Sequence, residues 1–390
     1  MNIVYILSAT TPFGGATKSF LTLLLPFVEK GIKPIVVVPD TKGIYKDLND
    51  ANIETIAIKY RPNTYPDLNK AKDWILFLPR LIARRYINRI AVQKLTKVFR
   101  HSNISLVHTN VSVIDIGYRV ANKLQIPHIY HVREYGDIDF GKHYFPTWAS
   151  FHHTLHAPTS YSICITKGIQ RHHGLENERK SLVIYNGISN KKQLCNQQEK
   201  NYFLYAGRIE PAKDLLFLLQ AYKEYKKVAP HPTPLWIAGG VSDSMYYQKI
   251  QDFIACHQLQ DSIIFLGPRS DIDTIMQEAK AIIIPSRFEA FGRCMAEAMF
   301  NGCIVTGRNT GGTKEQFDNG IAQTGKEIGL RFSSIEDLQQ QLQKLDTLSP
   351  IEKKNLRENA FKAVASLYSE DTYIQQIYHF YQDILHGKKD

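Results

Sequence analysis

The sequence predicts an α/β protein of two domains, each built on a doubly wound parallel sheet. The chain has 390 residues, which exceeds what one hydrophobic core usually holds and suits two domains. Short apolar runs rich in β-branched residues alternate with helical patterns, which is typical of parallel strands joined by crossover helices. A charged stretch rich in Gln and Asn at 188–200 lacks apolar periodicity, as expected of a linker between domains.

These patterns place the boundaries at 1–187 for the first domain, 188–200 for the linker and 201–370 for the second domain. A helix of the first domain is expected at 17–30, where Gly31 stops it. Apolar runs predict strands at 2–8, 33–39, 53–58, 105–110, 126–134, 202–206, 281–284 and 303–306. Helical patterns cover 335–345, 352–367 and 372–385.

Composition narrows the class of protein. Hydrophobic residues make up 44% and charged residues 22%, as in soluble globular proteins. No apolar run approaches the roughly 20 residues of a membrane span, and the amino-terminal run lacks the basic flank of a signal peptide. The odd number of scattered cysteines predicts reduced thiols and a cytoplasmic location. They are Cys164, Cys195, Cys256, Cys294 and Cys303.

The net charge of +11 and the pI near 9.2 indicate a negatively charged partner. A nucleotide, a nucleic acid and an anionic lipid all satisfy this condition, and charge alone does not choose among them.

The most informative stretch runs from Pro285 to Gly312 and reads as strand, loop, helix and strand. Glu289 lies on the loop, and Glu297 lies eight residues later inside a helix that begins near Arg293. The N–H groups at that helix start have no intrahelical partner, so they can hold an anion or a polar sugar. In isolation, the two glutamates are better interpreted as a loop charge and a solvated helix residue.

The E-x7-E spacing, with Phe291-Gly292 inside it, resembles the retaining glycosyltransferases of family 4, which have the GT-B fold. The resemblance implies two Rossmann-like domains facing across a cleft and a carboxyl-terminal helix, 371–390, that crosses back to the first domain. It implies that Glu297 binds the ribose hydroxyls of a nucleotide-sugar. Glu289 would meet the hydroxyls of the donor sugar, near backbone groups of Ala290, Phe291 and Gly292.

A second motif begins the second domain, where Gly207-Arg208 follows a strand and Lys213 precedes a helix. A close backbone, two cations and a helix N-terminus suit a diphosphate, and the pattern matches the family's G-R…K signature. The family often has Gly after this lysine, whereas this chain has Asp214. The alternative is that Arg208 and Lys213 are surface charges at a loop.

Three further positions carry expectations from the resemblance. Gly14 and Gly15, between a strand and a helix, match the family's glycine-rich loop, although such a pair is also common in plain turns. His131, at the end of a strand, looks like the histidine that binds the donor sugar near the reacting carbon; a structural histidine is the alternative. Arg269 could stack on the nucleotide base.

The segment Arg80–Arg100 holds seven basic residues and no acidic one, and its apolar residues recur at helical spacing. Ile87, Ala91, Leu95 and Val98 are expected on the buried face, which Lys94 interrupts. We expect either a solvated basic helix or a contact with an anionic membrane surface.

The resemblance predicts sugar transfer from a nucleotide diphosphate donor, UDP-linked or else GDP-linked, to a hydroxyl of a glycan or a lipid-linked acceptor. It points to surface polysaccharide biosynthesis, in the cytoplasm or peripherally on the membrane. No metal or other cofactor is expected, so the two D-x-D sequences at 137–139 and 271–273 and the histidines 152, 153 and 156 are interpreted as structural. The alternatives are a nucleotide-sugar epimerase of the same fold and a basic protein that binds nucleic acid or membrane.

Overall fold

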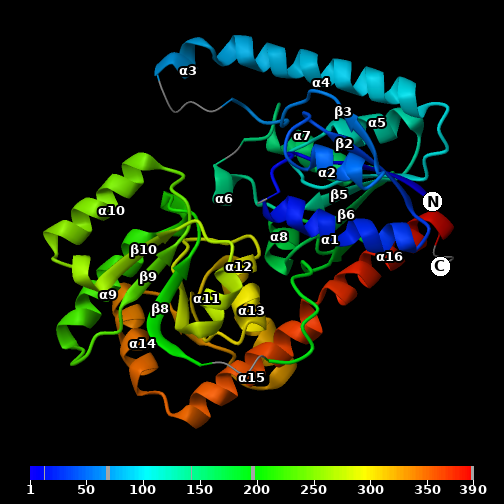
Figure 1. The fold of residues 1–390 in the computed structure, drawn as a ribbon. Coiled ribbons are helices and arrows are strands. Elements are labelled where there is room, and N and C mark those ends of the chain that lie inside the picture. The colour runs from blue at the N-terminus through cyan, green and yellow to red at the C-terminus, as the bar shows by residue number, and fades with distance from the viewer. Residues whose placement is uncertain (13, 67–70, 142, 195–197, 388–390) are drawn as a thin grey trace. The chain divides into compact units, whose positions relative to one another are not determined.

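The computed structural model describes residues 1–12, 14–66, 71–141, 143–194 and 198–387 (Figure 1). The chain divides into two compact units. The first comprises Met1–Gly187 together with the chain from Tyr373 onward, and the second comprises Ile188–Thr372. Part of the predicted linker, residues 195–197 with Cys195, lies outside the described residues, as do residues 388–390 of the predicted last helix.

The described part of the first unit forms a seven-stranded parallel sheet in the order β3-β2-β1-β4-β5-β6-β7. Its strands are β1 (Asn2–Ile6), β2 (Lys33–Val38), β3 (Glu54–Ala57), β4 (Leu106–Thr109), β5 (His128–Val132), β6 (Ser160–Cys164) and β7 (Ser181–Val183). The strand order reverses between β1 and β4, and ligands of such sheets bind beyond the carboxyl ends of the strands at this point.

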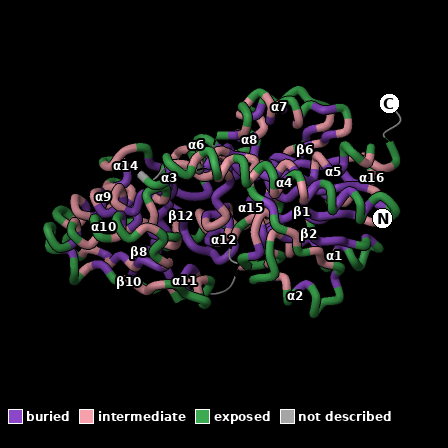
Figure 2. The backbone as a smooth tube through the Cα atoms, turned by 90° about the horizontal axis from the view of Figure 1, so that it is seen from above, coloured by how far each residue is buried: buried purple, intermediate pink, exposed green. Residues whose placement is uncertain are grey.

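Helices cover both faces of this sheet. They are α1 (Gly15–Glu29), α2 (Ile44–Asp50), α3 (Ala71–Ile75), α4 (Phe77–Phe99), α5 (Ile116–Leu124), α6 (Asp137–Phe140), α7 (Trp148–Leu155), α8 (Lys167–His172) and α16 (Glu370–His386). Apolar side chains of α1, α2 and α16 form one core with the sheet. Those of α4 and α5 form another core, with the alternate residues of the same strands. In Figure 2 the tube along β1 and β2 is buried, whereas α2 is largely exposed.

The described part of the second unit forms a six-stranded parallel sheet in the order β10-β9-β8-β11-β12-β13. Its strands are β8 (Lys200–Ala206), β9 (Leu235–Ala238), β10 (Ile263–Gly267), β11 (Ala279–Ile284), β12 (Val305–Arg308) and β13 (Leu330–Phe332). Its helices are α9 (Leu215–Val228), α10 (Ser244–Cys256), α11 (Ile272–Glu278), α12 (Arg293–Phe300), α13 (Gly311–Thr324), α14 (Ile335–Thr347) and α15 (Pro350–Leu367), with 3₁₀ turns η1 (Pro211–Lys213) and η2 (Gln260–Ser262).

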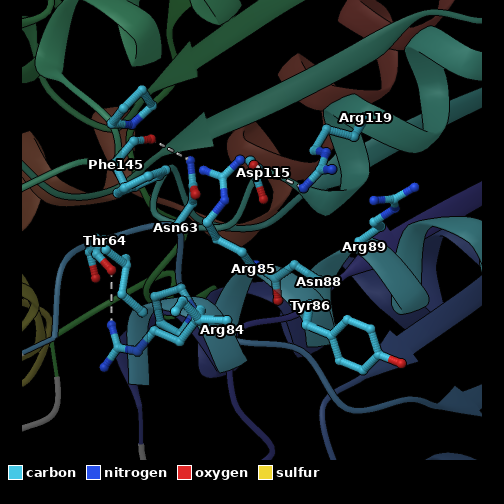
Figure 3. Close-up of a pocket in the computed structure, with 14 residues that line it drawn as sticks. Asn63, Thr64, Arg84, Arg85, Tyr86, Asn88, Arg89, Asp115, Arg119 and Phe145 are labelled. Atoms are coloured by element: carbon cyan, nitrogen blue, oxygen red, sulfur yellow. Dashed lines mark hydrogen bonds and ion pairs between the residues drawn. The ribbon is translucent and has the colours of Figure 1, made fainter. Parts of the chain in front are cut away.

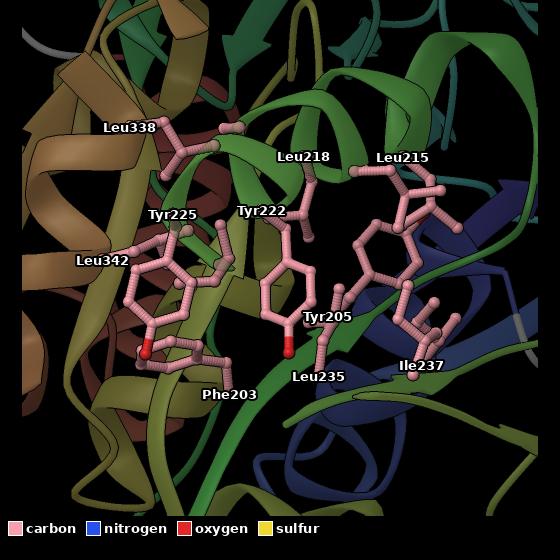
Figure 4. Close-up of a cluster of buried hydrophobic side chains, with 14 of the residues drawn as sticks. Phe203, Tyr205, Leu215, Leu218, Tyr222, Tyr225, Leu235, Ile237, Leu338 and Leu342 are labelled. Carbon is pink, nitrogen blue, oxygen red and sulfur yellow. The ribbon is translucent and has the colours of Figure 1, made fainter. Parts of the chain in front are cut away.

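The core of the second unit lies between its sheet and helices α9, α10 and α14 (Figure 4). Two tyrosines of α9 are buried in it, and each keeps a hydrogen bond for its hydroxyl. Tyr222 donates to the carbonyl of Thr233 at 2.9 Å, and Tyr225 donates to Asp346 at 2.5 Å. Buried phenols need such partners because an unpaired hydroxyl in a core costs free energy. The two hydrogen bonds therefore tie α9 to the segment before β9 and to α14.

Two predictions about elements need correction. The strand expected at 303–306 lies at Val305–Arg308, because Gly302 ends α12 with φ of 73° and the next two residues form the connection. In α4, Val98 is 51% exposed and Lys94 is also exposed, so Val98 is not on the buried face and Lys94 does not interrupt it. The buried residues of α4 are Asn88, Ala91, Val92, Leu95, Thr96 and Phe99.

Candidate functional site

Three glycines bring the carboxyl ends of β8, β9 and β10 into backbone contact. The Gly207 N–H donates to the carbonyl of Ala238 at 2.9 Å, and the Gly239 N–H donates to that of Gly267 at 2.8 Å. A Cβ on Gly239 would lie 1.8 Å from the Gly207 oxygen, and its φ of 151° disfavours any other residue. The predicted site residue Gly207 therefore lies where the sheet edge is packed backbone to backbone.

The loop after β8 carries both predicted cations. The Tyr205 hydroxyl donates to the carbonyl of Arg208 at 2.8 Å, which holds the start of the loop against the strand. The Arg208 side chain is 60% exposed and pairs with Glu210 at 2.9 Å, from Nη2 to Oε1. Lys213 ends the 3₁₀ turn η1 and directly precedes Asp214, the N-cap residue of α9. The loop thus presents two cations beside the amino-terminal end of a helix.

Asp214 stands where the resemblance led us to expect glycine. Its backbone is left-handed, with φ of 49°. Its carboxylate lies 2.9 Å from Nη1 of Arg308 and 3.2 Å from Nε of Arg287. Aspartate tolerates this backbone region better than most residues, and the two guanidinium groups neutralise its charge. The left-handed turn is therefore formed here without glycine.

The loop between β11 and α12 is held by backbone contacts on both sides. The Arg287 N–H donates to Ala212 of the η1 turn at 3.1 Å, and the Gly312 N–H donates to the carbonyl of Glu289 at 2.7 Å. A Cβ on Gly312 would lie 2.5 Å from the Phe291 oxygen, so only glycine fits there. The G-G sequence that begins α13 thus has a structural role in the packing of this loop.

These contacts bring the two predicted motifs together. Nζ of Lys213 lies 2.6 Å from Oε1 of Glu289, and the two side chains are 24% and 17% exposed. Between them and the strands lies Cys294, whose Sγ donates to the carbonyl of Ala206 at 3.3 Å. Burial raises the pKa of the Cys294 thiol, and the charges of Glu297 and Glu289 raise it further. The thiol is therefore neutral, and the charged groups of the site are the cations and the carboxylates.

Helix α12 begins at this loop. Gly292 is its N-cap residue with φ of 87°, no side chain caps the helix, and no acidic residue lies in its first turn. Glu297 lies one turn further and pairs with Arg293, with 3.3 Å between Oε1 and Nε. The positive end of the helix dipole thus has no acidic side chain in its own first turn, and a ligand anion would be stabilised there.

Arg269 follows β10 and forms a bidentate pair with Asp271, at 2.8 Å and 2.6 Å. This pair lowers the pKa of the Asp271 carboxyl. The guanidinium plane is 42% exposed, so stacking on a base would have to leave this pair intact or exchange it. The stacking role of Arg269 stays a prediction.

In the first unit, His131 is fully buried in a polar network. Its Nδ1 lies 3.2 Å from Nε2 of His108 and 3.2 Å from Nη2 of Arg133, whose Nη1 donates to Asn186 at 2.7 Å. Burial first, and then the Arg133 charge, hold the pKa of His131 well below its ordinary value, so the ring is neutral. Its Nε2 has no hydrogen-bond partner among the described residues. The predicted contact with a donor sugar therefore requires a path from solvent to this atom.

Gly14 is the N-cap residue of α1, and Gly15 is the first residue of that helix. A Cβ on Gly14 would only make ordinary contacts at 3.6 Å with Thr11 and Thr17, so the protein itself does not require glycine there. No acidic residue lies in the first turn of α1, which leaves the helix N-terminus suited to an anion. The binding role of both glycines stays a prediction.

Among the described residues, no group of three His, Cys, Asp or Glu side chains is arranged to hold a metal ion. The D-x-D residues have other contacts. Asp139 accepts hydrogen bonds from the N–H groups of Tyr135 and Gly136 at 2.9 Å and 2.7 Å, at the start of α6. Asp273 accepts one from Asn301 at 2.9 Å. Both sequences are thus helix-start residues, as we interpreted them.

The sequence analysis missed three contributors to this site, namely Glu210, Arg287 and Arg308. Glu210 sits in the same G-R…K loop, so its charge could have been noticed beside Arg208. Arg287 and Arg308 lie 73 and 94 residues from Asp214 in sequence, and no local pattern links them to it. Their pairing is a product of the tertiary fold.

The second unit is similar to known proteins. Residues 188–363 match the family model described as glycosyl transferases group 1. An uncharacterized glycosyltransferase of Methanocaldococcus jannaschii is 25% identical over 304 residues, 74% of this chain and 81% of the relative. A lipopolysaccharide 1,2-N-acetylglucosaminetransferase of Salmonella typhimurium is 29% identical over 198 residues, 48% of this chain and 49% of the relative. The match to the latter spans about half of either protein.

Solved structures establish the fold. The Anabaena protein HepE in complex with UDP superposes with a TM-score of 0.77 at 18% identity, over 98% of this chain and 100% of that one. A sucrose-phosphate synthase from Thermosynechococcus elongatus superposes with a TM-score of 0.75 at 16% identity, over the whole of both chains. The fold is GT-B, with two parallel-sheet α/β domains, and this prediction is confirmed. No described helix is long and apolar enough to cross a membrane.

Proposed function

This chain is a glycosyltransferase, and we propose that it moves a sugar from a nucleotide diphosphate donor to a hydroxyl of a glycan or lipid-linked acceptor with retention of configuration. The observation that supports this most is the convergence of Lys213 and Glu289, at 2.6 Å, beside the exposed Arg208. A diphosphate needs cations, and the sugar attached to it needs a hydrogen-bond acceptor. This loop pair offers both within one site.

Both cations have carboxylate partners within the protein, Arg208 with Glu210 and Lys213 with Glu289. A diphosphate carries more charge than either carboxylate, so we expect it to replace them as the partner of both cations. Glu289 would then accept hydrogen bonds from the sugar hydroxyls. Glu297, one helical turn beyond the start of α12, would accept those of the ribose.

Charge develops on the diphosphate as the bond from the anomeric carbon to the leaving oxygen breaks. Arg208, Lys213 and the N–H groups at the start of α12 would stabilise that charge without a metal ion. We propose that the acceptor hydroxyl attacks from the face that the diphosphate leaves, and that the leaving phosphate oxygen takes its proton. Retention then needs no covalent enzyme intermediate, and the described site holds no obvious nucleophile, since the Cys294 thiol has a raised pKa and is protonated.

A UDP-sugar is the donor we favour, with a GDP-sugar as the second choice. Related folds include HepE solved with UDP and with UDP-glucose, which makes a uridine donor the first to test. The sequence relatives include lipopolysaccharide and O-antigen glycosyltransferases of Salmonella typhimurium, which favours an acceptor from surface polysaccharide biosynthesis.

The test is calorimetric binding of UDP, GDP and ADP, followed by turnover of the matching sugar nucleotides with and without EDTA. We expect one nucleotide to bind best, and Arg208→Ala with Lys213→Ala to reduce turnover by about 100-fold or more. Lys354→Ala is the control, because Lys354 is an exposed cation of the same unit, 72% accessible, with only a distant partner.

Three outcomes would contradict the proposal. Absolute dependence on Mn²⁺ would show that a metal ion, and not Arg208 and Lys213, stabilises the diphosphate. Product formed without any acceptor would identify a nucleotide-sugar epimerase instead. Salt-sensitive binding to DNA that sugar nucleotides do not compete away would favour a nucleic-acid-binding protein.

A further inference from the structure

A pocket of about 460 Å³ lies in the first unit, and none of its lining residues belongs to the candidate site described above (Figure 3). The amino-terminal half of α4 forms one wall. The loops that follow β3 and β4 form the others, through Asn63 and Asp115, together with Phe145 from the segment between α6 and α7. These loops leave the carboxyl ends of parallel strands, which is where α/β sheets bind ligands.

The charge in this pocket is strongly positive. Four arginines line it against one carboxylate, that of Asp115. They are Arg84, Arg85, Arg89 and Arg119. Such an excess of guanidinium groups suits a phosphate, which accepts their hydrogen bonds in a bidentate manner.

The arginines are held in different ways. Arg84 donates to the carbonyls of Thr64 and Tyr65 at 2.9 Å and 3.2 Å, so it fixes the wall. The guanidinium of Arg85 lies over the ring of Phe145, 4.6 Å from its centre. Arg119 is only loosely paired, with Nη1 3.7 Å from Oδ2 of Asp115, as the dashed line in Figure 3 marks. Arg85, Arg89 and Arg119 are therefore the groups that can turn toward an anion.

Asp115 adds a second requirement for the ligand. Its Oδ1 is buried and has no hydrogen-bond partner among the described residues. Burial raises the pKa of this carboxyl, and the charges of Arg119 and Arg85 oppose that shift. An unpartnered buried oxygen in an arginine-rich pocket fits a ligand that brings a hydroxyl as well as an anion.

An apolar stripe leads to the mouth of the pocket. Leu78, Ile82 and Tyr86 follow one another at every fourth residue of α4, which places them on one face, and Trp74 precedes them on α3. The exposed fractions of Leu78, Ile82 and Tyr86 are 64%, 66% and 65%, and that of Trp74 is 68%. The ion pair between Arg80 and Asp73, at 2.6 Å, ties the two helices together.

Ile82 and Tyr86 belong to both features, because they also line the pocket. A row of large apolar side chains left in water is unusual for a soluble protein and marks a surface that binds something apolar. The stripe and the arginines together form one amphipathic surface.

We propose that this pocket binds the phosphate-bearing, hydroxyl-containing head group of a lipid, whose hydrocarbon lies along the stripe. The phosphate would lie among Arg85, Arg89 and Arg119, and a head-group hydroxyl would donate to Oδ1 of Asp115. The binding site does not depend on the proposed glycosyl transfer; only the idea that this lipid is the acceptor rests on it.

Only some of the basic residues of the Arg80–Arg100 segment line this pocket. Lys94, Lys97 and Arg100, in the carboxyl-terminal half of the segment, do not line the pocket. Substituting these three residues offers a matched control, because it removes the same number of positive charges as substituting the three pocket arginines. If the interaction were only a general attraction to anionic surfaces, both sets would matter equally.

The experiment measures the affinity of the full chain for phosphatidylcholine vesicles with and without phosphatidylglycerol, and for glycerol 1-phosphate as the soluble probe. UDP is present in excess throughout, so that the cations of the second unit are occupied. Three variants are compared with the wild type. The pocket variant combines Arg85→Gln, Arg89→Gln and Arg119→Gln. The control triple variant combines Lys94→Gln, Lys97→Gln and Arg100→Gln. The stripe variant combines Leu78→Ser and Ile82→Ser.

We expect the pocket variant to lose about 100-fold in affinity for phosphatidylglycerol vesicles and the control triple variant less than about tenfold. The stripe variant should weaken binding to vesicles but not to glycerol 1-phosphate. Equal losses in both triple variants, or no binding of either probe, would overturn the proposal. If glycerol 1-phosphate bound as tightly as the vesicles and the stripe variant were unaffected, the ligand of this pocket would be a soluble phosphate compound and not a lipid.

An unchanged thermal unfolding midpoint shows that each variant is folded, and unchanged UDP binding to the second unit keeps this test separate from that of the proposed function. A variant that binds the lipid normally but fails to bind UDP would count against the glycosyl-transfer site alone.

Discussion

Lys213 and Glu289 form an ion pair with 2.6 Å between Nζ and Oε1, although 76 residues separate them in the sequence. Each belongs to a different motif on a different loop, one after β8 and one after β11. The pair joins the loop that offers cations to the loop that offers a carboxylate and a helix N-terminus. It therefore defines the centre of the candidate donor site.

The first prediction separates the two partners of this pair. Lys213→Met should weaken UDP binding by about tenfold or more, because a charge-assisted hydrogen bond to the diphosphate is lost. Glu289→Gln should leave UDP binding unchanged or tighter, since Lys213 no longer has to leave a carboxylate, while turnover of the sugar nucleotide falls. Calorimetry and turnover measured on both variants decide it. Equal loss of UDP affinity in both would show that Glu289 does not compete with the diphosphate for Lys213.

The second prediction concerns the left-handed residue Asp214. Asp214→Ala should destabilise the protein by about 2–3 kcal/mol, because it strains the turn and leaves Arg308 without its carboxylate. Asp214→Gly removes the same charge, but glycine adopts the left-handed conformation without strain. This variant should therefore be destabilised by about 1 kcal/mol less than Asp214→Ala. Urea unfolding of both variants measures the difference. If the two variants were equally stable, the backbone of Asp214 would not be strained.

The third prediction uses neighbouring glycines at the end of β9. Gly239→Ala should destabilise by more than about 3 kcal/mol, because its Cβ would lie 1.8 Å from the carbonyl oxygen of Gly207. Gly240→Ala is the matched control, since its Cβ would meet only Pro268 at 3.6 Å, and it should change stability by less than about 1 kcal/mol. Thermal unfolding compares them. Similar melting temperatures would mean that the strand ends are not packed as closely as the structure has them.

The fourth prediction concerns pH and Glu134, which is buried in the first unit. Burial raises the pKa of its carboxyl from 4.5 to about 7, against the hydrogen bonds that it accepts from Ser112 and Val113. The folded state thus binds a proton that the unfolded state has lost between pH 4.5 and about 7. Stability from this group is complete below pH 4.5 and falls as pH rises through the folded pKa.

Glu134→Gln cannot titrate, so it lacks this fall. Between pH 5 and 7.5 the wild type should lose on the order of 2 kcal/mol relative to the variant. The difference between their unfolding free energies is the quantity to measure, because neutral buried histidines such as His128 act on both proteins in the opposite sense. Parallel pH profiles would show that Glu134 is ionised in the folded protein.

Local patterns were sufficient for most of the architecture. Strand β2 and helix α14 begin at the residues that the sequence analysis predicted, because alternation, apolar periodicity and stop signals such as Gly31 act over a few neighbouring residues. The short strands β6 and β13 were not predicted. The three residues of β13 and the serine-rich run of β6 carry too little apolar signal of their own, and it is pairing with β5 and β12 that orders them.

The sequence by itself determined the two-domain α/β class and placed Arg208, Lys213, Glu289 and Glu297 on the loops and the helix where the structure has them. Only the tertiary structure decided that Lys213 meets Glu289, that Arg287 and Arg308 neutralise Asp214, and that His131 is buried beside Arg133. The physical reason is distance along the chain. Propensity and spacing report on neighbours, whereas ion pairs and burial arise between segments that meet only when each sheet is assembled.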